Sequence, residues 1–227
     1  MKAAVIQFPG SNADWDAFHT LRDVVTVPTE YVFHKSTKLP AGTDLVVLPG
    51  GFSYGDYLRC GAIARFSPIM AAVREHAERG GYLLGICNGF QILTEAQILP
   101  GALTRNAHLR FECRDIVVRV DADGPFTQEL RGTTLRLPIA HAEGRYQADA
   151  DTLTKLENER LIAFRYVSPE GINPNGSMHD IAGLYGGPRR NVCGLMPHPE
   201  RASEPILGSD DGRKLFQSVA RAILARN

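Results

Sequence analysis

Short apolar runs alternate with segments of helical character along the first ninety residues of the chain. Four runs, each closed by glycine, proline or polar residues, predict strands at 2–8, 26–33, 43–51 and 82–87. Between them, 11–24 begins with Ser11 or Asn12 as an N-cap, and 67–81 begins with Ser-Pro and ends in Gly-Gly, which are helix start and stop signals. This alternation predicts an α/β fold whose central sheet is mostly parallel and covered by helices on both faces.

The pattern changes after Leu103, where apolar runs follow one another without clear helices between them. We expect further strands, some of them antiparallel, that extend the same sheet at 115–120, 133–140, 161–167 and 181–186. The final segment, 210–227, predicts a covering helix with five apolar side chains on one face: Leu215, Phe216, Val219, Ala222 and Ile223. No linker, repeat or low-complexity tract separates these segments, so a single domain over residues 1–227 is predicted.

Composition narrows the class of protein. The 227 residues are 44% hydrophobic and include 25 basic and 25 acidic side chains, with a pI of ≈ 7.1. This balance gives no support for nucleic acid or an anionic membrane as a partner. No apolar run is long enough for a signal peptide or a membrane span, so we expect a cytoplasmic protein.

Of the four cysteines, Cys87 has the sequence context that suggests chemistry. It ends the run 82–87 within Gly-Ile-Cys-Asn-Gly, which matches the G-x-S-x-G elbow of hydrolases with cysteine as the nucleophile. A helix that began at Asn88 would direct its N-terminal dipole at the sulfur and favour the thiolate. A buried structural cysteine in a glycine-rich turn is the alternative. The other three cysteines form no C-x-x-C pair and are expected only to pack: Cys60, Cys113 and Cys193.

His198 is the candidate base among the seven histidines. It lies in Met-Pro-His-Pro-Glu-Arg, where a proline on each side biases the backbone toward an extended conformation. Because residues i and i+2 of an extended segment face the same way, His198 and Glu200 are predicted to project together. A carboxylate beside an imidazole fixes its tautomer and stabilises its cation. A surface histidine and glutamate in a proline-rich turn are the alternative interpretation.

An acyl-transfer site also needs donors for the oxyanion. Gly50 and Gly51 close the run 43–51, and glycines let backbone N–H groups turn toward a ligand without steric cost. The N–H of Asn88, the residue after Cys87, is the second candidate donor, as in the hydrolase elbow. A plain tight turn is the alternative, so this prediction depends on the combination of elbow, base and glycines.

The sequences around Cys87, Gly-Ile-Cys-Asn-Gly-Phe-Gln-Ile-Leu, and around His198 resemble the class I glutamine amidotransferases, whose triad runs cysteine, histidine, glutamate in this order. Further segments are similar to the glutaminase subunits of phosphoribosylformylglycinamidine (FGAM) synthase: 8–12, 49–65, 138–146, 173–177 and 181–184. The long segment 49–65 is the most specific of them. Two positions depart from the pattern of that family, since Ala13 stands where cysteine is frequent and Ala142 where glycine is frequent.

The resemblance implies a flavodoxin-like fold and a glutaminase mechanism. Cys87 would attack the side-chain amide of L-glutamine and form a thioester, His198 would protonate the leaving ammonia and then activate water, and Glu200 would orient His198. The resemblance also implies an oxyanion and substrate site that is made of Gly50, Gly51, Asn88, Gln91 and His141.

The resemblance further implies that the chain acts within a larger enzyme. Ammonia would pass to a large PurL-type synthetase subunit, accompanied by a small PurS-type accessory subunit, which converts formylglycinamide ribonucleotide (FGAR) to the amidine in purine biosynthesis. The chain contains neither a G-x-x-x-x-G-K-[ST] loop nor a G-x-G-x-x-G fingerprint. ATP and Mg²⁺ are therefore expected on the partner, with no cofactor and no metal in this chain.

The segment 50–62 is the predicted docking site for the synthetase. It combines glycines with residue types that anchor interfaces, namely Phe52, Tyr54, Tyr57, Leu58 and Arg59. The alternative is that these side chains pack the loop onto its own domain. Three other functions stay open at this point: an amidotransferase with another acceptor, a stand-alone cysteine hydrolase of similar fold, and a non-catalytic docking subunit.

Overall fold

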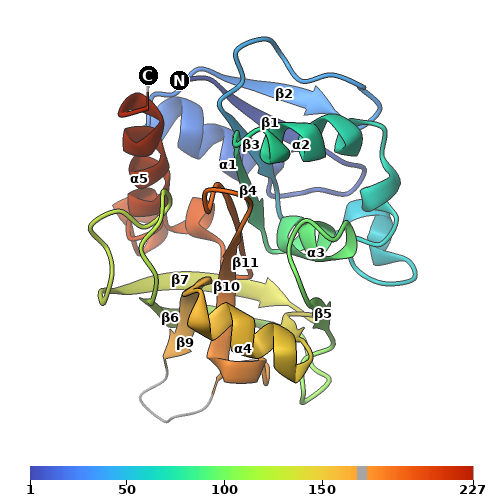
Figure 1. The fold of residues 1–227 in the computed structure, drawn as a ribbon, viewed down its shortest axis with the longest axis vertical. Helices are drawn as coiled ribbons and strands as arrows, with labels where there is room; N and C mark the ends of the chain where they lie inside the picture. The colour runs from blue at the N-terminus through green and yellow to red at the C-terminus, as the bar shows by residue number, and fades with distance from the viewer. Residues whose placement is uncertain (168–172, 227) are drawn as a thin grey trace.

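A nine-stranded sheet runs through residues 1–167 and 173–226, which the computed structural model describes (Figure 1). Its strand order is β2-β1-β3-β4-β11-β10-β9-β6-β7. The first five strands are parallel: β2 Thr29–Phe33, β1 Ala3–Gln7, β3 Leu45–Leu48, β4 Tyr82–Ile86 and β11 Val192–Leu195. The other four add antiparallel pairings: β10 Ile181–Gly186, β9 Ile162–Val167, β6 Glu112–Val120 and β7 Thr134–His141. The predicted parallel sheet with antiparallel additions is confirmed.

Helices cover both faces of the parallel strands, as predicted. In Figure 1, α1 and α5 lie on one side of these strands, and α2 and α3 lie on the other. Their bounds are α1 Asp14–His19, α2 Ile69–Glu78, α3 Asn88–Glu95 and α5 Arg213–Leu224. The apolar face predicted for the last helix is buried on α5 in full.

The burial of each strand explains its sequence pattern. All four residues of β3 are buried, because helices cover this strand on both faces, and a strand covered on both faces becomes a continuous apolar run. Along β7, by contrast, exposed or half-buried residues alternate with buried ones. An antiparallel strand with one face toward water has this period of two.

The predicted start of the first helix is wrong. The helix begins at Asp14, and Ala13 at its N-cap position makes no side-chain hydrogen bond. The Ser11 hydroxyl instead accepts from the N–H of Phe8 at 3.1 Å and donates to the Phe8 carbonyl at 2.9 Å. Ser11 therefore closes the turn that precedes the helix, a local use of serine that competes with capping.

A fourth α-helix, α4 Ala150–Asn158, lies where no helix was expected. Asp149 caps it by accepting a hydrogen bond from the N–H of Thr152 at 2.7 Å. Only Leu153 and Leu156 of this helix are buried, so its apolar stripe is too short to stand out from the sequence. A two-stranded sheet, β5 Ala102–Thr104 with β8 Arg145–Gln147, was also not predicted.

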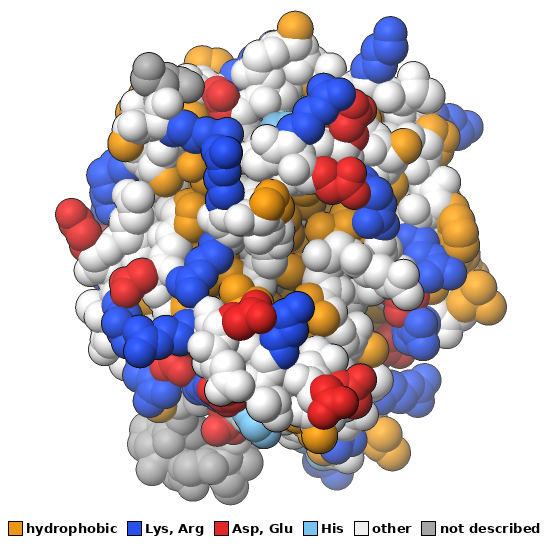
Figure 2. Space-filling model, viewed as in Figure 1, with side chains coloured by type: hydrophobic (Ala, Val, Ile, Leu, Met, Phe, Trp, Pro, Cys, Tyr) orange, Lys and Arg blue, Asp and Glu red, His pale blue; other side chains and the backbone are white. Residues whose placement is uncertain are grey.

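The surface carries mixed charge on the face seen in Figure 2, where basic and acidic side chains are interspersed. In the part of the chain that the structure describes, no helix combines the length and the apolar character that a membrane span requires.

Candidate active site

The carboxyl ends of three adjacent parallel strands bring the candidate residues together. Gly50 follows β3, Cys87 follows β4 and His198 follows β11. The N–H of Cys87 donates to the carbonyl of Leu195 at 2.8 Å, which fixes the end of β4 to β11. A Cβ atom added to Gly50 would lie 2.7 Å from Cε1 of His198, so only glycine leaves room for the imidazole. Ligands of open α/β sheets bind at this edge.

Cys87 occupies a strained turn between β4 and α3. Its φ of 50° and ψ of −105° lie outside the regions that L-residues ordinarily adopt, and such backbone strain costs about 1–3 kcal/mol. A Cβ atom on Gly89 would collide with the carbonyl of Leu48, and one on Gly85 would lie 2.8 Å from the Gly89 carbonyl. Close packing therefore requires both glycines of the Gly-Ile-Cys-Asn-Gly elbow.

His198 and Glu200 form a buried pair. Nδ1 of His198 donates to Oε1 of Glu200 at 2.5 Å, and the side chains are 3% and 0% exposed. Burial lowers the pKa of His198, but the negative charges of Glu200 and Cys87 outweigh burial and raise it to about 10. Because Nδ1 carries the proton that faces Glu200, Nε2 is the ring nitrogen left for proton transfer. Nε2 is buried without a hydrogen-bond partner among the described residues.

The backbone route to this pair differs from the expected one. His198 has φ −103° and ψ 87°, but Pro199–Ala202 form a 3-10 turn rather than an extended segment. The N–H of His198 donates to the carbonyl of Pro138 on β7 at 2.8 Å. The predicted meeting of the two side chains therefore arises from a tight turn and a backbone contact with β7, and not from i, i+2 alternation.

The candidate oxyanion donors come from the ends of two neighbouring strands, since Gly51 follows β3 and Asn88 follows Cys87 at the end of β4. Gly51 has a φ of +138°, and an added Cβ would lie 2.6 Å from the backbone of Ser11 and Asn12, so other residues are excluded there. Asn88 is the first residue of α3, and its N–H therefore has no acceptor within the helix. Both N–H groups can serve a ligand at the strand ends.

Gln91 and the turn after β7 form a wall beside the elbow. Nε2 of Gln91 donates to the carbonyl of Glu143 at 2.6 Å, and its Oε1 accepts from Nδ2 of Asn88 at 2.9 Å. His141 is buried, with Nδ1 3.1 Å from Oδ1 of Asn106 and Nε2 3.5 Å from Nδ2 of Asn175. Both ring nitrogens of His141 thus face protein groups.

Sequence reasoning missed the polar network that holds this wall. Oδ1 of Asn106 also accepts from the N–H of Gly144 at 3.1 Å, and Nδ2 of Asn175 donates to the Gly144 carbonyl at 2.9 Å. Ser177 donates to Oδ1 of Asn175 at 2.7 Å. In the sequence, the segment 173–177 is marked only by its resemblance to the family. Its Asn-Pro-Asn-Gly-Ser pattern is typical of a turn stabilised by its own side chains. That signal could have identified the turn, but not its contact with His141.

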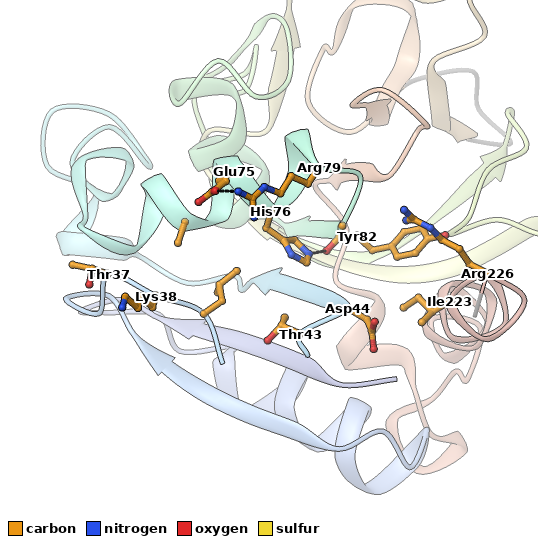
Figure 3. Close-up of a pocket in the computed structure, with 13 residues that line it drawn as sticks. Thr37, Lys38, Thr43, Asp44, Glu75, His76, Arg79, Tyr82, Ile223 and Arg226 are labelled. Atoms are coloured by element: carbon orange, nitrogen blue, oxygen red, sulfur yellow. Dashed lines mark hydrogen bonds and ion pairs between the residues drawn. The ribbon is translucent and has the colours of Figure 1, made fainter. Parts of the chain in front are cut away.

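A separate pocket of ≈ 590 Å³ lies at the amino ends of the parallel strands, near the starts of β3 and β4 (Figure 3). Asp44 and Tyr82 line it at these strand starts. Three of its charged or titratable groups already have neighbours, since Arg79 pairs with Glu75 and His76 lies 3.1 Å from the carbonyl of Tyr82. The lining contains no cysteine, so the candidate chemistry belongs to the carboxyl-end site.

Comparison with known proteins identifies the family. Residues 1–216 match the model of the CobB/CobQ-like glutamine amidotransferase domain. The chain belongs to the glutamine amidotransferases. It is 56% identical to the phosphoribosylformylglycinamidine synthase subunit PurQ of Gloeobacter violaceus over 99% of both chains, and 54% identical to that of Methanosarcina acetivorans over 97% of both. A chain of the solved structure of PurLQS from Thermotoga maritima superposes with a TM-score of 0.87 at 42% identity, over 98% of both chains.

The two departures from the family pattern leave this amidotransferase site intact. Ala13 is fully buried, and its N–H donates to the carbonyl of Gly50 at 3.2 Å. Ala142 is exposed and does not have a positive φ. Its carbonyl accepts from the N–H of Asn106 at 2.9 Å, so alanine replaces glycine at this turn without strain.

The loop 50–62 of the amidotransferase is part packed and part exposed. Tyr54 packs on its own domain, with its hydroxyl 2.7 Å from Nδ1 of His34 and 2.9 Å from Oγ of Ser67. Arg59 donates to both carboxylate oxygens of Glu95 on α3, at 2.5 and 2.9 Å. Three other large side chains of the loop are exposed: Phe52, Tyr57 and Leu58.

Proposed function

We propose that the chain is the glutaminase subunit of phosphoribosylformylglycinamidine synthase. It hydrolyses L-glutamine to glutamate and ammonia, and the ammonia converts FGAR to FGAM in cytoplasmic purine biosynthesis. The observation that carries the proposal is the strained Cys87 beside the buried His198–Glu200 pair, in a chain 56% identical to a PurQ protein along its length. A complete triad weighs against a non-catalytic docking subunit.

In the first half-reaction the Cys87 thiolate attacks the side-chain carbonyl carbon of glutamine. The N–H groups of Gly51 and Asn88 receive the oxyanion, a contribution typically worth about 10²–10³-fold in rate per donor. His198, held as the imidazolium by Glu200, donates its Nε2 proton to the leaving nitrogen. The C–N bond breaks, ammonia departs and a γ-glutamyl thioester remains on the sulfur.

In the second half-reaction water replaces ammonia. Neutral His198 takes a proton from the water molecule through Nε2, and the water oxygen attacks the thioester carbon. The carbon–sulfur bond breaks, which releases glutamate and restores the thiolate beside the imidazolium. Glu200 keeps the ring in one tautomer through both steps, while Gln91 and the wall at 141–144 hold the substrate.

The ammonia goes to a large PurL-type subunit that binds ATP and Mg²⁺, with a PurS-type accessory subunit in the complex. We place the contact at the exposed part of the loop 50–62, because this loop is attached to the nucleophile helix. Nδ2 of Asn88 donates to Oδ1 of Asp56 at 3.3 Å, and Oδ1 of Asn88 accepts from the N–H of Ser53 at 3.2 Å. A partner that moves this loop therefore acts on Asn88 and Gly51.

Replacement of Cys87 tests the assignment. In the complex with the synthetase subunit, Cys87→Ser should abolish FGAM synthesis from glutamine and leave synthesis from added ammonium salts intact, because the second reaction belongs to the partner. A glutamine-analogue electrophile should label Cys87. The Cys193→Ser variant keeps Cys87 and is the control, so it should be labelled like the unmodified chain. Near-normal glutamine turnover in Cys87→Ser would refute the proposed function.

A further inference from the structure

One face of α1 is attached to the segment that follows the triad histidine. Asp16, His19 and Thr20 have the i, i+3, i+4 spacing of one helical face. Oδ2 of Asp16 accepts from Nε of Arg201 at 2.9 Å, and Nε2 of His19 lies 2.8 Å from Oε2 of Glu204. These contacts join residues about 185 positions apart in the sequence, so side chains of the helix hold it against the segment.

Thr20 makes the contact closest to the triad. The helix widens here into a π-helical turn, Thr20–Val24, a feature that is frequent at functional sites. The Thr20 hydroxyl is buried, 3.2 Å from the carbonyl of Glu200 and 3.0 Å from Oγ of Ser203, which donates to the same carbonyl at 3.1 Å. A helical threonine ordinarily bonds to a carbonyl of its own preceding turn. This one reaches another segment instead.

The side chain of Glu200 needs such support. Its Oε1 accepts from His198, while its Oε2 is buried without a partner among the described residues. A carboxylate held at one oxygen follows its backbone, so the position of the turn Pro199–Ala202 decides whether Oε1 meets the imidazole. The hydroxyls of Thr20 and Ser203 fix that turn at the Glu200 carbonyl.

We propose that Thr20, together with Ser203, is a positioning residue for the triad, which anchors the backbone of Glu200 so that its carboxylate stays on His198. The inference rests on the proposed function, because it gives residues outside the triad a task in the same reaction. Thr20 acts only through Glu200. Its removal should therefore matter little once the Glu200 carboxylate is gone.

A double-mutant cycle tests this dependence. Thr20→Val removes the hydroxyl and keeps the shape, and glutamine-dependent ammonia release is measured in the complex with the synthetase subunit. Thr20→Val should lower kcat roughly threefold to thirtyfold with KM unchanged, and less than about twofold in a Glu200→Gln background. Thr20→Ser, which keeps the hydroxyl, should recover most of the loss.

Thr127→Val is the matched control. Thr127 is also fully buried, donates to the carbonyl of Ala122 at 2.7 Å and lies 2.8 Å from the hydroxyl of Tyr185, and neither of these two partners belongs to the triad segment. It should lower the thermal stability of the chain and leave kcat of the folded complex within about twofold. A loss of activity through misfolding alone would affect both variants.

The pH dependence of Cys87 alkylation by iodoacetamide gives a second measurement. If the Glu200–His198 contact loosens, the imidazolium is less stable and the thiolate forms at higher pH, so the alkylation profile of Thr20→Val should shift to higher pH. An equal loss of kcat in both backgrounds, or an unshifted profile, would overturn the inference. Absence of glutaminase activity in the unmodified complex, with the shift retained, would instead overturn the proposed function.

Discussion

At the residue scale, two buried histidines at one site have pKa values that are shifted in opposite directions. Burial, and after it the positive charge of His198, lower the pKa of His141 to about 4. Burial acts the same way on His198, yet the carboxylate of Glu200 and the charge of Cys87 reverse the result. His198 can therefore hold the proton that the leaving ammonia needs, while His141 stays neutral and adds no second cation beside it.

This difference predicts the ranking of two substitutions. His198→Ala should lower glutamine turnover by about 10²–10⁴-fold, because general acid–base assistance is worth this much. Glu200→Ala should cost less, because the carboxylate orients and charges the ring without transferring a proton. Steady-state glutaminase assays of the complex measure both, with Glu78→Ala, at an exposed carboxylate on α2, as the control. A larger loss in Glu200→Ala would mean that the two roles are wrongly assigned.

At the scale of elements, the elbow depends on how closely α3 approaches β3. Gly89 lies in the first turn of α3 against the carbonyl of Leu48, where no side-chain atom fits. This contact explains why the strand-to-helix turn at Cys87 is so tight. The conformation of the nucleophile is thus set by packing between two elements and not by Cys87 itself.

Gly89→Ala should consequently lower both the stability of the chain and its glutaminase activity. The added methyl must move α3 away from β3, which costs about 1–3 kcal/mol as overpacking of a core does, and the shift carries Cys87 and Asn88 with it. Chemical denaturation and glutaminase assays measure the two effects. Gly42→Ala is the control, since a Cβ there meets nothing within 4 Å and only its φ of +73° is unfavourable. Full activity in Gly89→Ala would contradict this account of the elbow.

The elements that were predictable are those whose burial produces a recognisable pattern in the neighbouring sequence. The buried β3 produced an apolar run, and the elbow at Cys87 showed its glycines within two residues of the sulfur. The network at His141 produces no such pattern, because Asn106 and Asn175 reach it from loops more than thirty residues away in sequence. Nothing local in the sequence indicates which asparagine will bond to a distant histidine.

At the scale of the whole molecule, the partly exposed loop 50–62 contacts α3, the helix that follows Cys87, from its first turn to its last. Asn88 holds it at the first turn of α3, and Glu95 holds Arg59 at the last turn. A Cβ on Gly61 would lie 2.7 Å from the N atom of Ile92, so the loop also packs directly on the helix between these two points. A partner bound to the exposed side of this loop can therefore reorganise the proposed oxyanion donors without contact to the sulfur.

The exposed Leu58 makes that coupling testable. Its side chain is 94% exposed and its φ is +69°, so it contributes nothing to the core of the isolated chain. Leu58→Ser should leave the unfolding free energy unchanged but weaken binding of the large subunit about tenfold, as loss of an apolar interface anchor does. The isolated chain should be a poor glutaminase, activated by titration with that subunit, and the variant should need more of it. Ile206→Ser, at a side chain 90% exposed in a different turn, is the matched control. If both variants bind and respond to the large subunit as the unmodified chain does, the synthetase docks elsewhere and the loop only stabilises α3.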